Sequence, residues 1–224
     1  MKLIVKSMLV LTALLSGCAL TSRSEPLQVR YFSADSARQP PAQPVGSAPQ
    51  IGLRLDRVRS SSHLGEAIAY RSSEYEVGYY DIERWTERPE AFLERGLDRA
   101  LFQEYGLRRV IAGASEALSV ELVSFEEVRG SKPVARLEAI ITLHDERTSH
   151  LEQTLRLEQP IAQGDGKDPA ARAVAALSAV LAEAIDKIAR MVAERLTAVA
   201  AAEAAPAAGP PAVSVQEPAR DSLR

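Results

Sequence analysis

Thiol and imidazole groups are scarce in this sequence. The 224 residues include one cysteine, Cys18, and three histidines, His63, His144 and His150. The three histidines are isolated from one another, and none stands in a metal-ligand spacing such as HExxH. We therefore predict no catalytic residue, no metal site and no cofactor, and we expect that the protein is not an enzyme.

Two short segments contain residue types used in catalysis or phosphate binding. "SSSHLGE" (residues 60–66) brings serine, histidine and glutamate together, but the members of a catalytic triad converge from separated elements. "GDG" (residues 164–166) precedes a predicted helix, yet no phosphate-loop lysine follows in register. We interpret both segments as loops.

The sequence has no excess of charge of either sign. Its 27 basic and 30 acidic residues give a net charge of -3, and like charges do not occur in runs. This balance excludes the basic surface that nucleic-acid binding requires, and also a basic arm or an acidic tail. With 46% hydrophobic residues, a chain of this length predicts one domain with one core.

The amino-terminal apolar run is too short to span a bilayer. Two lysines precede the uncharged run Met8–Leu15, and the small residues Ser16 and Gly17 follow it. Spanning needs about 20 apolar residues, so this three-part layout is typical of a bacterial export signal instead. We predict that residues 1–17 form a signal peptide that is cleaved between Gly17 and Cys18.

The position of the cysteine refines this prediction. The segment Leu15-Ser16-Gly17-Cys18 resembles the lipobox of bacterial lipoproteins, and the alternative is a chance cysteine in an ordinary signal peptide. The resemblance implies that the Cys18 thiol carries a diacylglycerol and the new amino group an acyl chain, which together anchor the protein permanently. Residues 18–26 then form a lipidated tether. Ala19 stands where inner-membrane lipoproteins have aspartate, which favours the periplasmic face of the outer membrane over the inner membrane.

The rest of the sequence predicts an α/β (α+β) domain over residues 27–196. Alternating patterns indicate strands in a mixed, largely antiparallel sheet, and the last three form a meander. A proline-rich loop occupies residues 34–49, and residues 197–224 are predicted to be a disordered Ala/Pro-rich tail. The predicted strands are "PLQVRYFS", "IGLRLDRV", a strand pair within "AIAYRSSEYEVGYYDIERW", "RRVIAG", "ALSVELVSFEEV", "VARLEAIITLHDE" and "HLEQTLRLEQPI".

Two amphipathic helices are predicted to cover this sheet. The first has Thr86 as its cap, Pro89 in its first turn and Gly106 as its stop. The second begins at Asp168 as N-cap and follows one apolar stripe to the region of Thr197. That stripe comprises Val174, Leu177, Leu181, Ile185, Ile188, Val192 and Leu196.

A group of aromatic and arginine side chains in the predicted strand pair is the one candidate binding surface. Tyrosine, tryptophan and arginine are the residues that anchor protein interfaces, but the alternative, that the rings simply fill the faces of the strands, is favoured over docking. The candidate residues for partner docking are Tyr70, Arg71, Tyr79, Tyr80, Arg84 and Trp85.

The order of these features resembles the ABC-type transport auxiliary lipoproteins, the family that includes the paraquat-inducible protein C-like lipoproteins. The similarity runs from Leu27 to Val192, and its matching positions are Leu64, the Tyr70-Arg71 pair and the segment Arg84–Glu87. The resemblance implies a fold like the amino-terminal domain of TolB. It also implies a non-catalytic role beside an ABC permease, an ATPase and a mammalian-cell-entry domain protein in lipid transport between the two envelope membranes.

The resemblance suggests that the anchored domain docks transporter components at the outer membrane and supports envelope integrity. Two other functions stay open: a lipid-binding carrier, and a regulatory lipoprotein acting on cell-wall synthesis. A carrier needs a cavity lined by apolar residues, whereas a regulator would associate with cell-wall synthases. A homo-oligomer is also open.

Overall fold

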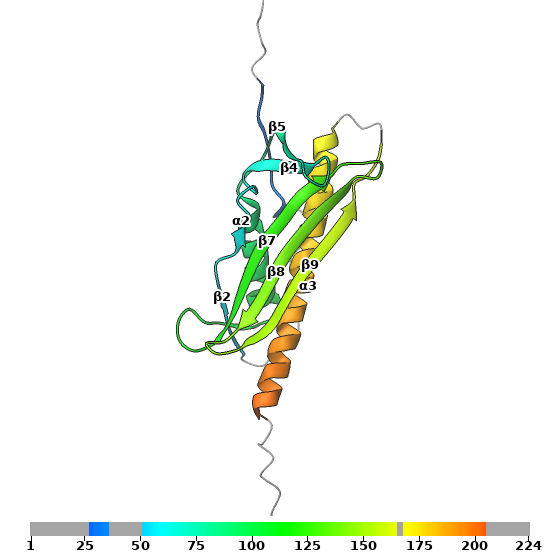
Figure 1. Cartoon of the computed structure of the whole chain (residues 1–224). Coiled ribbons are helices and arrows are strands. Elements are labelled where there is room, and N and C mark those ends of the chain that lie inside the picture. The colour runs from blue at the N-terminus through cyan, green and yellow to red at the C-terminus, as the bar shows by residue number, and fades with distance from the viewer. Residues whose placement is uncertain (1–26, 36–50, 165–167, 205–224) are drawn as a thin grey trace, which may run out of the picture.

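The computed structural model describes residues 27–35, 51–164 and 168–204. The predicted signal peptide, Cys18, the tether and most of the proline-rich loop lie outside the described residues, as do residues 205–224. The described chain forms a nine-stranded mixed sheet and two long helical segments, which confirms the predicted fold class (Figure 1). The chain enters at the end of the molecule where β4 and β5 lie, and α3 ends at the opposite end.

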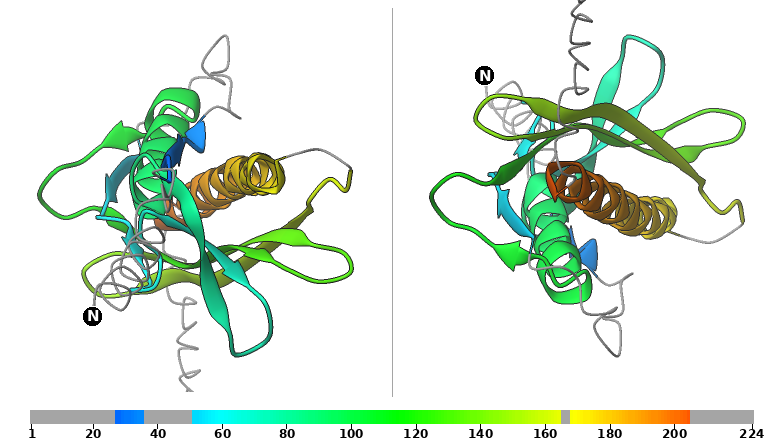
Figure 2. Two further views of the ribbon diagram at one scale, coloured as in Figure 1. Left: turned by 90° about the horizontal axis from the view of Figure 1, so that it is seen from above. Right: turned by 90° about the horizontal axis from the view of Figure 1, so that it is seen from below.

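The predicted meander forms the largest part of the sheet. Strands β7 (Glu116–Val128), β8 (Val134–His144) and β9 (Ser149–Pro160) are antiparallel neighbours over almost their whole length. In β8, alternate residues from Ala135 to Leu143 are buried, so one face of the meander lines the core. Figure 2 shows α3 lying across this face with α2 beside it.

Six shorter strands form the rest of the sheet, beside β7. In the order β1-β5-β4-β7-β2-β6, β4 and β2 pair with β7 in parallel, and β3 pairs with β7 in parallel as well. β4 and β5 form the predicted strand pair. These strands are β1 (Arg30–Phe32), β2 (Gly52–Leu55), β3 (Arg59–Ser60), β4 (Ala67–Arg71), β5 (Val77–Trp85) and β6 (Arg108–Arg109).

Helix α3 (Pro169–Ala204) covers the meander with the stripe that the sequence predicts. All seven predicted stripe residues are buried, and the Ala171 N–H donates to Asp168 Oδ1 over 3.0 Å, which confirms the N-cap. The helix continues to Ala204, so the prediction of a disordered tail from residue 197 is wrong for residues 197–204. Alanine, which dominates that segment, has the highest helix propensity and extends the helix beyond its packed stripe.

Helix α2 (Pro89–Asp98) continues as the π-helical segment η2 (Arg99–Glu104). The N-cap is Arg88, so the prediction of Thr86 as cap is wrong; the Thr86 N–H instead donates to the Phe32 carbonyl over 2.9 Å, joining the end of β5 to β1. Gly106 has φ 67°, and the Leu107 N–H donates to the Leu101 carbonyl over 3.0 Å. This left-handed glycine confirms the predicted stop.

Helices α2 and α3 lie in close contact at Gly96. A Cβ atom added there would overlap Ile185 Cδ1 and lie 3.0 Å from Ile185 Cγ1. Helix propensity alone would make Gly96→Ala stabilising by about 1 kcal/mol. We expect the reverse, a net loss of about 1–2 kcal/mol in the free energy of unfolding, because the new methyl group would displace the buried Ile185 side chain from its packed position, and the adjacent cavity of about 20 Å³ is too small to receive it.

Urea denaturation followed by the fluorescence of Trp85, the only tryptophan, measures this change. Gly65→Ala is the matched control, since nothing lies within 4 Å of a Cβ atom added at Gly65. Adding Ile185→Val removes the overlapping methyl group and should make Gly96→Ala less costly than it is in the parent chain. A stabilising Gly96→Ala variant would contradict this account of the helix contact.

Candidate functional site

The predicted docking residues lie on the β4–β5 hairpin, but they do not form one surface. Trp85 is 1% exposed and packs against Phe92 and Phe125, with ring centroids 5.9 and 5.4 Å away. The prediction that Trp85 belongs to a docking surface is therefore wrong. Its ring fills the core between the sheet and α2.

Arg84 stabilises an irregularity in β5. Ala67 pairs with Arg84 and Ala69 pairs with Tyr79, so the single residue Ile68 lies opposite the four residues 80–83. The Arg84 guanidinium donates to the carbonyl oxygens of Tyr80, Asp81 and Glu83 at 2.7–3.0 Å. It therefore satisfies backbone carbonyls in the part of β5 that the bulge removes from pairing with β4, which is a structural task.

Tyr70 and Tyr80 enclose an arginine at the end of β7. The Arg129 Cζ atom lies 3.3 Å from the Tyr70 ring centroid and 5.1 Å from that of Tyr80, and the two rings meet edge to face at 5.7 Å. The Tyr80 hydroxyl donates to Glu127 Oε2 over 2.6 Å. Burial and this hydrogen bond raise the pKa of Tyr80 to about 12. These aromatic residues fix the hairpin to β7.

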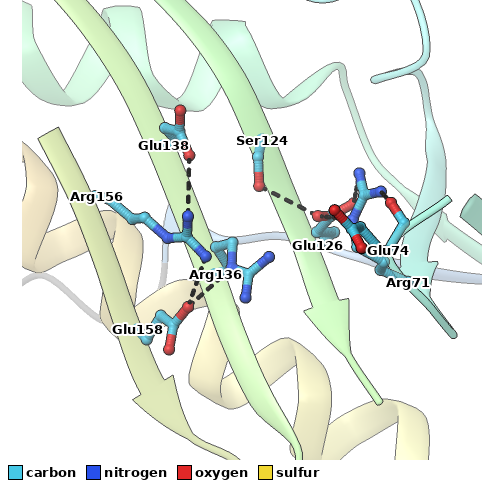
Figure 3. Close-up of polar contacts among 8 residues, drawn as sticks. All are labelled: Arg71, Glu74, Ser124, Glu126, Arg136, Glu138, Arg156 and Glu158. Atoms are coloured by element: carbon cyan, nitrogen blue, oxygen red, sulfur yellow. Dashed lines mark hydrogen bonds and ion pairs between the residues drawn. The ribbon is translucent and has the colours of Figure 1, made fainter. Parts of the chain in front are cut away.

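Arg71 forms an ion pair with a buried carboxylate. Its Nε and Nη2 atoms donate to Glu126 Oε1 and Oε2 over 2.7 and 3.2 Å, and the Glu126 side chain is 1% exposed. Arg71 also donates to the Glu74 carbonyl, and the Ser124 hydroxyl lies 3.5 Å from Glu126 Oε1 (Figure 3). This fork-shaped pair ties β4 to β7.

The charges continue across the sheet face that α3 does not cover. Glu126 is opposite Arg136 in the β7–β8 register, and Arg136 is opposite Glu158 in the β8–β9 register. Arg136 Nε donates to Glu158 Oε1 over 2.8 Å, which lowers the pKa of Glu158 (Figure 3). Arg156 lies 3.4 Å from Glu158 and 3.9 Å from Glu138. We call this alternating set, with Arg71, the charge ladder; it makes this face polar.

The exposed part of the hairpin is its tip. Tyr75, in the turn between β4 and β5, is 90% exposed. Tyr79 is 41% exposed, and its hydroxyl donates to the His63 carbonyl over 3.0 Å. Of the predicted docking residues, Tyr79 alone is exposed, because the others are intermediate or buried. Tyr75 was not among the predicted residues, since its exposure follows from the turn geometry.

One cluster that the sequence did not predict involves His150. Its Nε2 atom lies 3.2 Å from Glu116 Oε1 and 3.1 Å from Asp145 Oδ2, so the interpretation of this histidine as isolated is wrong. The N–H groups of Arg147 and Thr148 donate to Asp145 Oδ1 and lower the pKa of Asp145. These three side chains are of the types that ligate divalent metals, and their ligand atoms lie within 4.8 Å of one another. The contacts of His150 with the two carboxylates hold these three side chains together.

Three hollows among the described residues are small, polar or open to solvent. The cavity between α2 and α3, lined by Gly96, Leu181 and Ile185, has a volume of about 20 Å³. A hollow of about 370 Å³ on the uncovered sheet face is lined mostly by polar groups such as Asp56, Arg59 and Glu121, and one of about 380 Å³ beside the end of α3 is open. Sites for apolar ligands are typically enclosed and apolar over about 300–1,000 Å³. This geometry does not favour a lipid cavity within the described part of the chain.

Known proteins resemble this chain in sequence family and in fold. The family model described as "ABC-type transport auxiliary lipoprotein component" matches residues 35–189. The crystal structure of protein XCC0632 from Xanthomonas campestris has a TM-score of 0.62 at 16% identity and covers 78% of this chain and 99% of its own. The crystal structure of an uncharacterized protein has a TM-score of 0.57 at 15% identity, with coverages of 74% and 99%. At such identities these two likenesses show the fold alone.

No curated protein matches the sequence. Among the described residues, no helix combines the length and the apolar character that crossing a membrane requires.

Proposed function

Because the chain belongs to the ABC-type transport auxiliary lipoprotein family, we propose that it is the outer-membrane-anchored, non-catalytic subunit of a mammalian-cell-entry lipid transport system. In this role it holds transporter components at the periplasmic face of the membrane and supports envelope integrity. Its partners are the mammalian-cell-entry domain protein and, through it, the ABC permease and ATPase. The family match over residues 35–189 is the observation that carries this proposal.

The anchor is Cys18. The segment Leu15-Ser16-Gly17-Cys18 supplies the small residues and the thiol that lipoprotein processing requires, and Ala19 favours the outer membrane. Two or more acyl chains hold a protein on a bilayer essentially permanently, whereas one gives only reversible binding of roughly 10⁴ M⁻¹. No transmembrane helix is needed for this attachment.

The docking surface is the tip of the β4–β5 hairpin. Tyr75 and Tyr79 present aromatic rings to solvent, and the Arg71–Glu126 pair and the Tyr70–Arg129 stack hold the hairpin rigidly to β7. Rigid aromatic side chains give binding energy at low entropic cost. A lipid-binding carrier is the less favoured function, because the larger hollows around the described residues are polar or open.

Removing the anchor should remove the protein from the membrane. In Cys18→Ala, the thiol that accepts the diacylglycerol is absent, so we expect an unprocessed precursor or soluble protein in place of the mature lipoprotein. Fractionation of cells followed by mass spectrometry of the amino-terminal peptide measures this outcome. Wild-type amounts of mature Cys18→Ala protein in the outer membrane would contradict lipidation.

The docking proposal is tested by a photo-crosslinking amino acid placed at Tyr75 or Tyr79 in living cells. We expect adducts with the mammalian-cell-entry domain protein from both positions. Ile111, 87% exposed in the loop between β6 and β7, is the matched control and should give none. Adducts with cell-wall synthases would favour the regulatory alternative, and adducts with no transport subunit would overturn the docking role.

A further inference from the structure

The segment that leads into β1, together with Tyr31 of the strand, exposes apolar side chains to solvent, whereas the half-exposed Arg30 is paired with acidic groups of the domain. Leu27, Val29 and Tyr31 are 78%, 45% and 64% exposed. Arg30 lies among them, yet its guanidinium pairs with Asp168 at the start of α3 and lies 3.4 Å from Glu83 on β5. Charged side chains on an edge strand commonly protect it from aggregation, but the three outward positions here are apolar, and exposed apolar edges are ones that proteins usually cover.

The inner contacts hold this strand in one orientation. Phe32 packs against the core cluster, and the Arg30 Cζ atom lies 4.9 Å from the Phe32 ring centroid. β1 runs parallel to β5, with Tyr31 paired with Arg84 and Phe32 with Trp85. A rotation that buried the apolar residues would therefore break the ion pairs of Arg30 and withdraw Phe32. We call Leu27, Val29 and Tyr31 the apolar edge; nothing in the described part of the chain covers it.

The position of the apolar edge indicates what covers it. Figure 1 shows residues 27–29 running straight into β1 at the end of the molecule where β4 and β5 lie, whereas α3 ends at the far end. Leu27 follows Cys18 by nine residues, and nine residues extend over at most about 30 Å. Acyl chains on Cys18 would therefore keep the apolar edge within a short distance of the bilayer surface.

We infer that the apolar edge lies in the headgroup region of the phospholipid leaflet that holds the Cys18 lipid. This inference rests on the lipid anchor of the proposed function. Tyrosine favours the boundary between headgroups and acyl chains, and leucine and valine insert below it. Contact along β1 would fix the domain on the membrane with the carboxyl-terminal end of α3 directed away from the surface, so that the domain does not swing freely on its tether.

A fluorescent probe on the lipidated full-length protein tests this contact. Cys18 is the only cysteine and its thiol is acylated in the mature protein, so a cysteine introduced by Val29→Cys is the single reactive thiol for an NBD label. Ile111→Cys is the matched control on an exposed apolar residue. Both proteins are reconstituted in vesicles of phosphatidylethanolamine and phosphatidylglycerol that contain lipid with a spin label near the headgroup. We expect quenching at residue 29 to exceed that at residue 111 roughly threefold, as for a side chain 5–10 Å into the interface.

The outcomes separate the inference from the function on which it rests. Protein that stays with the vesicles but is quenched equally at residues 29 and 111 overturns the membrane contact and leaves the anchor intact. A blue-shifted probe at residue 29 without lipid quenching shows that protein covers the apolar edge, which also overturns the inference. Protein that does not stay with the vesicles refutes the anchor and the inference together.

Discussion

Trp85→Ala should lower the free energy of unfolding by about 3–5 kcal/mol. The indole is 1% exposed and packs between Phe92 of α2 and Phe125 of β7, so its removal leaves a cavity where the hairpin, the helix and the central strand meet. Because domains of this size are stable by only about 5–15 kcal/mol, the variant would retain a small part of its stability. Urea denaturation followed by far-ultraviolet circular dichroism measures the change, since the only tryptophan is lost.

Tyr75→Ala is the matched control for this substitution. Tyr75 lies on the same hairpin but is 90% exposed, so its truncation should change the stability by no more than about 0.5 kcal/mol. The two variants also separate the two roles that the sequence left open for these aromatic residues. If Trp85→Ala were as mild as Tyr75→Ala, the indole would not be a core residue.

The sequence showed the strand pair that carries Trp85 but not which of its rings are buried. In a regular strand, alternate residues face the same side, and counting by two would assign each ring to a face. The bulge opposite Ile68 inserts extra residues in β5 and breaks this count between Tyr79 and Arg84. A bulge of this kind depends on contacts of the folded chain, here the bonds from Arg84 to backbone carbonyls, which no local pattern reveals.

Long elements were predicted well because each carries many repeats of its own period. The stripe of α3 and the alternation of β8 are examples, and both proved to be buried as expected. The two-residue strand β3 was not predicted, because it has too few positions for any period and exists through parallel pairing with the distant β7. The predicted strand "RRVIAG" is confirmed only for its first two residues, β6, which pair in parallel with β2.

Contacts between segments distant in sequence also explain why the sequence did not predict the His150 cluster and the Arg71–Glu126 pair. Glu116 and His150 are 34 residues apart and meet because β7 and β9 both flank β8. Arg71 and Glu126 are 55 residues apart and meet because β4 pairs with β7. The sequence identified Arg71 as a candidate through its aromatic neighbours, but its acidic partner could be found only from the sheet order.

Arg71→Met should destabilise the protein by about 3–5 kcal/mol, because it leaves the Glu126 carboxylate buried without its counter-ion. The double variant Arg71→Met, Glu126→Leu removes both charges and should return to within about 1 kcal/mol of the parent chain. Urea denaturation followed by the fluorescence of Trp85 measures all members of this double-mutant cycle.

Arg156→Met is the matched control from the exposed part of the charge ladder. The Arg156 and Glu158 side chains are 54% and 41% exposed, so water and salt screen their ion pair and its loss should cost no more than about 1 kcal/mol. Both substitutions remove an arginine from an ion pair with glutamate, so a difference in their free-energy cost reports the difference in burial of the two pairs. If both substitutions had the same small cost, Ser124 and Arg136 would suffice to satisfy Glu126, and the hairpin would not depend on Arg71 for its attachment to β7.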